Sequence, residues 1–290
     1  MSIEHRLKHT NANLRSPFGW IGGKHNVAKN ILPLIPAHKL YVEVFGGGLS
    51  LFYQKKPSKR EVINDYNEEL INLHLAIRNS PETLRMYINE LLPSRQLFYM
   101  IKHKELKPRC DIERAAFYFF LIKNSFGSSG RTWGMFDKTE DSTSKRKGIY
   151  REFTQHSRRL KMASIENRSF EYILKEYDHK NAFFYCDPPY YKFDGNKYYK
   201  NLKEAFNEDK HKLLNECLKK LKGKFILSYN DCEFIRELYK DFKQININVR
   251  WTLNNGETGD FGKKVGELLI MNFDPYQKEK KGLFDVKDLH

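Results

Sequence analysis

The sequence predicts an α/β protein with a doubly wound, mostly parallel sheet, interrupted by a mostly helical, basic insertion. Three observations support this fold class. Short apolar runs alternate with helical patterns near the start of the chain, helical and basic stretches replace them in the middle, and the alternation returns in the last third. Alternating strands and helices are typical of a parallel sheet with helices packed on its faces.

The first part of the chain contains two predicted strands around a glycine turn. Residues 40–45 (LYVEVF) predict a buried strand, which is followed at once by Gly46, Gly47 and Gly48. Residues 61–64 (EVIN) predict the next strand, which ends at Asp65, and residues 67–79 have apolar positions at helical spacing. The order of strand, glycine turn, helix and strand indicates parallel strands.

The middle of the chain predicts helices and carries much of the positive charge. Ser80 as N-cap and Pro81 at the first helical position predict a helix start, and residues 94–106 and 112–126 are also predicted to be helical. Residues 76–165 contain 18 Lys/Arg and 9 Asp/Glu, a net charge of +9. We therefore expect an insertion of residues 76–165 between two parts of one core domain, residues 1–75 and 166–290.

The last third of the chain returns to the α/β pattern. Predicted strands cover residues 182–186, 224–229, 245–253 and 267–273, and predicted helices cover residues 207–221 and 233–242. The last two strands could form an antiparallel hairpin at the sheet edge.

Composition limits the class of protein. The formal net charge of +15 suits a polyanionic partner, although a solvated basic surface would give the same number. The start of the chain has no apolar signal sequence, and no apolar run approaches the ~20 residues that span a bilayer. A cytoplasmic location and no membrane association are therefore expected. We also expect reduced thiols and no metal site, since no Cys-x-x-Cys pair occurs among Cys110, Cys186, Cys217 and Cys232.

The segment Asp187-Pro188-Pro189-Tyr190 follows the predicted strand 182–186. Open α/β sheets bind ligands at this end of their strands. The carboxylate of Asp187 and the carbonyl of Pro188 could each accept one N–H of an exocyclic amine, leaving the nitrogen lone pair free to attack a methyl donor. The ring of Tyr190 could stack on the base. A proline-rich turn without a catalytic role is the alternative.

Further candidates precede this segment in the chain. A glycine turn lets a ligand approach the backbone, and Glu43, in the strand before it, could meet the amino group of a methionine moiety. Asp65 could accept the ribose hydroxyls of a nucleoside cofactor, or could act as a turn or N-cap residue. In PFGWIGGK, residues 17–24, Lys24 could pair with a carboxylate and Trp20 could cover an adenine.

Taken in order, these strings resemble the Dam-type DNA adenine methyltransferases with a D12-class catalytic domain. The resemblance covers most of residues 15 to 273 and is carried by five strings: PFGWIGGK, YVEVFGGG, INDYN, FFYCDPPYY and NNGETGDFGKKVGELL. It implies a doubly wound S-adenosylmethionine-dependent methyltransferase core with an inserted, mostly helical DNA-recognition domain. It also implies that Trp20, Lys24, Asp65 and Asp187 contact S-adenosylmethionine, with Glu43 and Phe45 as further contacts.

The middle region matches this family less well. Members that methylate GATC usually carry an Asn-Gly-Leu-x-Arg-like loop, whereas residues 124–136 here read NSFGSSGRTWGMF. This departure puts a GATC target in doubt. The candidate DNA-binding residues in this loop are Asn124, Arg131 and Trp133. Arg131 could read guanine and Trp133 could wedge into the base stack, or both could be ordinary loop and packing residues. Further phosphate contacts are expected from Lys145, Arg146 and Lys147.

The resemblance implies methyl transfer from S-adenosylmethionine to adenine N6 of double-stranded DNA, by an enzyme that flips the base and needs no metal. The expected catalytic residues are Asp187, Pro188, Pro189 and Tyr190. We expect a monomer that could have a companion restriction endonuclease. Cytosine N4, an RNA base or a protein glutamine is an alternative target, and a DNA-binding regulator without activity is an alternative from another class.

Overall fold

Within the residues that the structure describes, seven strands form one sheet. This computed structural model describes residues 14–20, 22–134, 152–191, 206–250 and 264–277. The strand order is β3-β2-β1-β4-β5-β7-β6. The strands are β1 (Leu40–Glu43), β2 (Arg60–Asn64), β3 (Ser164–Glu166), β4 (Ala182–Cys186), β5 (Lys224–Asn230), β6 (Lys243–Arg250) and β7 (Lys264–Met271).

The sheet is parallel except at one edge. β1 lies between β2 and β4 and is parallel to both, with Glu43 opposite Ile63 and Tyr185. β7 runs antiparallel to both β5 and β6, so the expected antiparallel pair at the sheet edge is present. β7 occupies the place between β5 and the edge strand β6. Because the parallel strands end on the same side, Glu43, Asp65 and Asp187 all come to that side of the sheet.

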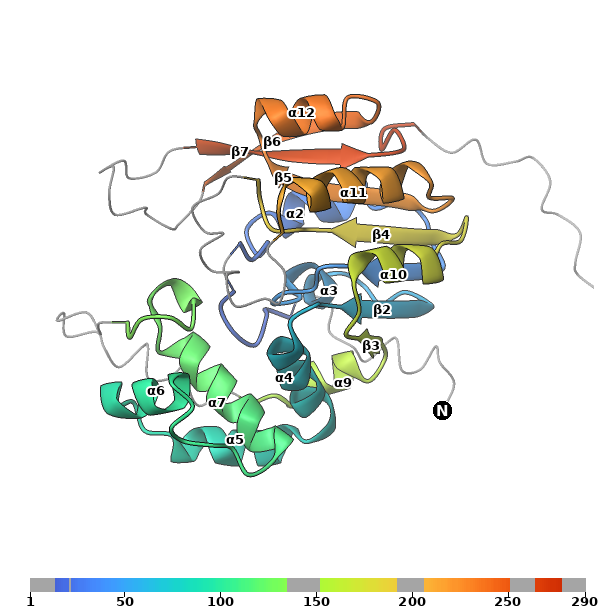
Figure 1. The fold of residues 1–290 in the computed structure, drawn as a ribbon. Coiled ribbons are helices and arrows are strands. Elements are labelled where there is room, and N and C mark those ends of the chain that lie inside the picture. The colour runs from blue at the N-terminus through green and yellow to red at the C-terminus, as the bar shows by residue number, and fades with distance from the viewer. Residues whose placement is uncertain (1–13, 21, 135–151, 192–205, 251–263, 278–290) are drawn as a thin grey trace, which may run out of the picture.

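Helices cover both faces of the sheet, which confirms the doubly wound fold (Figure 1). One face packs against α2 (Ala28–Ile31), α3 (Ser50–Gln54), α4 (Glu68–Asn79) and α9 (Thr154–Leu160). The other packs against α10 (Phe170–Glu176), α11 (Glu208–Lys219) and α12 (Glu233–Leu238). Residues alternate along each strand, so in β1 Tyr41 faces the first core and Val42 faces the second.

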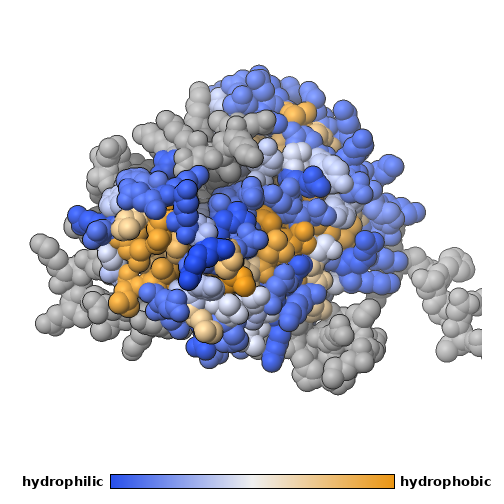
Figure 2. All heavy atoms as spheres, turned by 60° about the horizontal axis from the view of Figure 1, so that its bottom comes forward, coloured by the Kyte–Doolittle hydropathy of each residue, from blue (hydrophilic) through white to orange (hydrophobic). Residues whose placement is uncertain are grey.

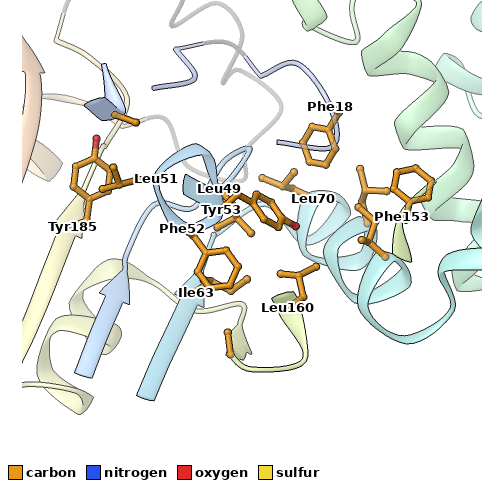
Figure 3. Close-up of a cluster of buried hydrophobic side chains, with 14 of the residues drawn as sticks. Phe18, Leu49, Leu51, Phe52, Tyr53, Ile63, Leu70, Phe153, Leu160 and Tyr185 are labelled. Carbon is orange, nitrogen blue, oxygen red and sulfur yellow. The ribbon is translucent and has the colours of Figure 1, made fainter. Parts of the chain in front are cut away.

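The first core extends beyond the sheet to the loop before α2. Phe18 of this loop lies among buried side chains of α3, α4 and Phe153 (Figure 3). Its ring packs edge-on against Phe119 at 6.4 Å between centroids. This contact fixes the loop that carries Trp20 and Lys24 against the helical part of the chain.

The helices from the middle of the chain form a helical part, which lies beside the sheet edge formed by β2 and β3 (Figure 1). Its helices are α5 (Pro81–Glu90), α6 (Arg95–Lys102) and α7 (Asp111–Lys123), and α7 packs against both α4 and α5. A small core of Phe98, Ile101, Phe117 and Phe120 joins α6 to α7. Among the described residues, no helix is both long enough and apolar enough to cross a bilayer.

Two elements near the end of residues 76–165 join the sheet part of the molecule, although α9 also packs against α4 and α5. β3 pairs with β2, and it crosses residue 165, where the sequence analysis puts the end of the insertion. From α9, Arg159 binds the carboxylate of Glu61 in β2, and Lys55 Nζ reaches the same carboxylate at 2.5 Å. All three side chains are buried, so this cluster anchors the chain after the helical part to the core.

Several helix boundaries differ from the expected ones because of local capping. Asn67 is the N-cap of α4, where its side chain accepts from the backbone N–H groups of Glu69 and Leu70. Ser94 caps α6 in the same way, whereas Ser80 precedes α5 without a side-chain hydrogen bond. Helix α6 ends at Lys102, earlier than residue 106, because Lys104 adopts a left-handed backbone conformation with φ of 62°.

Candidate active site

A large cavity opens at the carboxyl ends of β1, β2 and β4. Its volume is about 1360 Å³. The chain runs from β1 to β2 and β3 in one direction and from β4 to β5 in the other, so the cavity lies at the point where the strand order reverses. Ligands of open α/β sheets bind at such switch points. The predicted site residues that line it are Trp20, Lys24, Glu43, Phe45, Asp65, Arg131, Asp187, Pro188, Pro189 and Tyr190.

The glycine turn after β1 is held by Asp65. Gly47 has a φ of 49° and donates its backbone N–H to Asp65 Oδ2 at 2.8 Å. The other carboxylate oxygen accepts from the backbone N–H of Asn67 at 2.8 Å. A Cβ on Gly47 would lie 2.7 Å from the Trp20 indole nitrogen, so the turn requires glycine here. Burial raises the pKa of Asp65 despite these hydrogen bonds.

Lys24 is the centre of a cluster of polar side chains from three segments of the chain. Its Nζ lies 2.7 Å from Asp187 Oδ1 and donates to the Tyr190 hydroxyl at 2.7 Å. It also lies 3.4 Å from Oε1 of Glu267, a residue of β7. Burial alone would lower the pKa of Lys24, but the two carboxylates outweigh it and leave that pKa raised.

Lys24, Asp187 and Tyr190 all line the cavity, and the Asp187 side chain is more exposed there than that of Lys24. The exposed fraction of the side chain is 19% for Asp187 and 4% for Lys24. Burial raises the pKa of Asp187 to about 6, against the opposing effect of the Lys24 ammonium, and the Glu267 carboxylate adds to the rise. The group is therefore ionised at neutral pH and can accept hydrogen bonds from a ligand in the cavity.

Glu43 is a second acidic group that lines the cavity. Its Oε2 accepts from the Tyr41 hydroxyl at 2.7 Å, and burial raises the pKa of Glu43 to about 8. A cation bound beside it would lower that pKa again and hold the carboxylate in its charged form.

Two of the predicted DNA-binding residues pack within the protein. The Asn124 side chain donates to the Phe120 carbonyl at 2.9 Å at the end of α7, and it is buried. Trp133 packs edge-on against Phe98 at 5.7 Å between ring centroids. Neither belongs to the cavity lining, whereas Arg131 does. The predicted phosphate contacts Lys145, Arg146 and Lys147 lie outside the described residues.

Sequence reasoning gave no role to Glu267, which the structure brings to the site. The signal was present in the string KKVGELL, whose glutamate is a charged residue in an otherwise apolar strand end. Its partners Lys24 and Tyr190 lie far from it along the chain, so only the fold brings the three together.

The strand order, the glycine turn and the acidic groups at the ends of β1, β2 and β4 are those of a Rossmann-like methyltransferase core. Comparison with known proteins gives the family. Residues 20–253 match the D12 class N6 adenine-specific DNA methyltransferases. The chain belongs to this family, which confirms the resemblance in the motifs. It is an enzyme that transfers a methyl group to N6 of adenine in DNA.

Similar proteins include restriction-modification methyltransferases. Type II methyltransferase M1.LlaDCHI of Lactococcus lactis subsp. cremoris is 29% identical, over 92% of this chain and 98% of that protein. Type II methyltransferase M.MjaIII of Methanocaldococcus jannaschii is 30% identical, over 88% of this chain and 97% of that protein. The DNA adenine methylase of Escherichia coli (strain K12) is 24% identical, over 87% of this chain and 93% of that protein.

Proposed function

We propose that the cavity binds S-adenosylmethionine together with an adenine flipped out of double-stranded DNA, and that Asp187 and Pro188 hold the adenine amine for methylation. The observation that carries this proposal is the position of Asp187. It is fixed by the buried Lys24 at 2.7 Å and exposed to the same cavity that Asp65 and the glycine turn line.

The cavity fits the cofactor in its chemistry and size. Asp65 offers a carboxylate to ribose hydroxyls, Glu43 offers one to the amino group of the methionine part, and Trp20 and Phe45 offer aromatic surface to the adenine ring. The volume of about 1360 Å³ exceeds the roughly 300–1,000 Å³ of an ordinary small-molecule site. A nucleoside cofactor therefore leaves room for part of a second substrate.

The amine is held by two acceptors with different properties. When bound, S-adenosylmethionine supplies a methyl group activated on a sulfonium sulfur. Asp187 is ionised above a pKa of about 6 and accepts one N–H of the adenine amine. Pro188 has no backbone N–H, and its carbonyl accepts the second N–H. With both N–H groups held, the nitrogen lone pair would be free to bond to the methyl carbon as the carbon–sulfur bond breaks, which would release the cofactor as a neutral thioether. One N–H proton would pass to the Asp187 carboxylate, while the buried Tyr190 supports the base.

The DNA is proposed to lie over the cavity mouth, with residues 76–165 as the target-recognition part and residues 1–75 and 166–290 as the catalytic part. The end of α6 and the turn after it bring three exposed lysines to the cavity, and Arg131 lines it from the loop after α7. Phosphates release counterions on contact with such residues. Figure 2 shows the face that carries these helices, where hydrophilic side chains surround smaller apolar areas. The cavity-lining lysines are Lys102, Lys104 and Lys107.

A methylation assay tests this function. Purified protein, labelled S-adenosylmethionine and unmethylated duplex DNA should give label in DNA, and nucleoside analysis should find it in N6-methyladenine. Label in N4-methylcytosine, in RNA or in protein would instead support one of the other targets. Absence of label on every substrate would support a regulator without activity.

One partner proposal follows from the relatives. M1.LlaDCHI and M.MjaIII are type II methyltransferases. We therefore propose that this chain protects a site that a companion restriction endonuclease cuts. We also propose that the chain acts as a monomer in the cytoplasm. Sequencing of DNA from cells that express the chain would give the methylated site, against which a candidate endonuclease can be tested.

A further inference from the structure

Glu267 of β7 is a buried carboxylate that contacts the catalytic cluster but not the cavity. It pairs with Asn230 of β5 and Ile247 of β6, in the interior of the sheet. Its Oε1 accepts from the Tyr190 hydroxyl at 2.6 Å and lies 3.4 Å from Lys24 Nζ. Its Oε2 is buried and has no hydrogen-bond partner among the described residues.

Packing alone does not account for this carboxylate. Glu267 is fully buried, and the next residues of β7, Leu268 and Leu269, belong to the apolar cores on either side of the sheet. A leucine or methionine at this position would avoid the desolvation of a charge. The cluster holds one ammonium and two carboxylates, and Asp187 alone would neutralise Lys24. The second carboxylate therefore points to a role in how the cluster is arranged.

We propose that Glu267 is a positioning residue for methyl transfer, which rests on the proposed function. It holds the Tyr190 ring through the hydroxyl and is a second carboxylate, besides Asp187, that holds the Lys24 ammonium. With both partners fixed, Lys24 keeps the Asp187 carboxylate at the cavity wall where the adenine amine arrives. Glu267 touches no substrate itself.

The same carboxylate tunes the charge of the reacting group. Glu267 acts on Asp187 through space and contributes to the raised pKa of Asp187, about 6. Removal of that negative charge lowers the pKa of Asp187. The charged and titratable groups that interact electrostatically with Asp187 from the surrounding elements are Lys24, Glu43, Tyr185, Cys186, Tyr190, Tyr229 and Glu267.

Two substitutions of Glu267 separate the effect of its charge from the effect of its side-chain length. Glu267→Gln keeps an oxygen that accepts from Tyr190 but removes the charge, whereas Glu267→Asp keeps the charge and shortens the side chain. For Glu267→Gln we expect kcat to fall roughly 10-fold to 10²-fold, because small displacements of a reacting group have effects of that size. The acid limb of kcat/KM against pH should move below its wild-type midpoint. For Glu267→Asp we expect a similar fall in kcat with an unmoved acid limb.

Glu61→Gln is the matched control. Glu61 is also a buried carboxylate of the sheet with a lysine and an arginine on it, and it does not line the cavity. This variant should unfold at lower temperature, yet keep the wild-type kcat and acid limb at a temperature where it is folded. Thermal unfolding of all variants identifies that temperature.

The double variant Glu267→Gln with Tyr190→Phe tests the proposed contact. If Glu267 acts through the Tyr190 hydroxyl, the two losses in kcat should be less than multiplicative. A Glu267→Gln enzyme with wild-type kcat and an unmoved acid limb overturns the positioning role, as does a loss in kcat that merely follows the folded fraction. A wild-type protein that methylates no DNA overturns the proposed function instead.

Discussion

At the scale of single residues, the site depends on carboxylates kept at raised pKa values by burial. Asp187 and Glu43 both line the cavity, with pKa values of about 6 and about 8. Each therefore responds to a ligand differently from a surface carboxylate. Asp187 is ionised at neutral pH because Lys24 partly offsets its burial, whereas Glu43 is ionised only when a cation lies beside it or the pH is high.

The role of Asp187 predicts both a rate and a pH profile. Asp187→Ala should lower kcat by ~10²–10³, the usual effect of losing one preorganised electrostatic contact. The fold should survive, because the side chain lies past the strand end. In the wild type, the protonated carboxyl cannot accept the amine proton, so activity should rise with pH through about 6. Steady-state kinetics from pH 5 to 8 measure both, and methylation by Asp187→Ala at nearly the wild-type rate would exclude a catalytic role.

Asp65 should act on binding rather than on the reaction. Asp65→Ala removes the acceptor proposed for the ribose hydroxyls and also releases the N–H of Gly47. We expect the affinity for S-adenosylmethionine to fall by more than kcat falls at saturating cofactor. Calorimetric titration gives the affinity. Asp65→Asn keeps one acceptor oxygen, so its affinity for S-adenosylmethionine should lie between those of the wild type and Asp65→Ala. Unchanged affinity in Asp65→Ala would remove the residue from the cofactor site.

At the scale of elements, periodicity and turn chemistry predicted strands and helices where local sequence determines them. β4 was predicted at its observed bounds, since five consecutive apolar residues precede a double proline. β3 was missed, because Ser164–Glu166 is short and has no apolar pattern, and only its pairing with β2 defines it. The candidate site residues at the ends of β1, β2 and β4 were recognisable as motifs. Glu267 was not, because its role depends on contacts between distant segments.

The end of α6 with the turn after it should bind DNA in a different way from the loop after α7. Neutralising Lys102, Lys104 and Lys107 to Gln should weaken binding to all DNA and flatten the slope of log K against log salt by about 0.9 per lost phosphate contact. Arg131→Ala should cost roughly 1–3 kcal/mol on the preferred site and little on other DNA. Fluorescence titrations at several salt concentrations distinguish these outcomes.

A matched control uses three lysines near the other end of the parallel strands. Glutamines at the exposed Lys180, Lys220 and Lys222, just before β4 and β5, change the net charge by the same amount away from the cavity. If this control weakens DNA binding as much as the turn variant, total charge rather than the turn explains the affinity. If Arg131→Ala weakens all DNA equally, Arg131 contacts phosphate and does not read a base.

At the scale of the whole molecule, the active site lowers the stability of the fold that carries it. Between the ordinary pKa of 4.5 and the raised value of about 8, folded Glu43 holds a proton that the unfolded chain has released. The free energy of unfolding of the ligand-free protein should therefore fall with rising pH, by about 1.4 kcal/mol per unit from this one group. Thermal or urea unfolding at pH 6.5, 7.25 and 8 measures the slope.

The window from pH 6.5 to 8 separates Glu43 from three other buried groups with shifted pKa values, His74, His211 and Asp187. His74 and His211 are buried, with pKa values of about 4 in the folded protein and an ordinary pKa of 6.5. Their contribution makes the free energy of unfolding rise with pH between these two values and adds no slope well above pH 6.5. Asp187 is already mostly ionised above its pKa of about 6. Glu43→Gln, which cannot ionise, should therefore flatten the slope in this window. S-adenosylmethionine should stabilise the wild type more at pH 8 than at pH 6.5, because its ammonium favours the charged carboxylate. An equal slope in the wild type and in Glu43→Gln would mean that Glu43 is ionised in the free protein, with a pKa near its ordinary value.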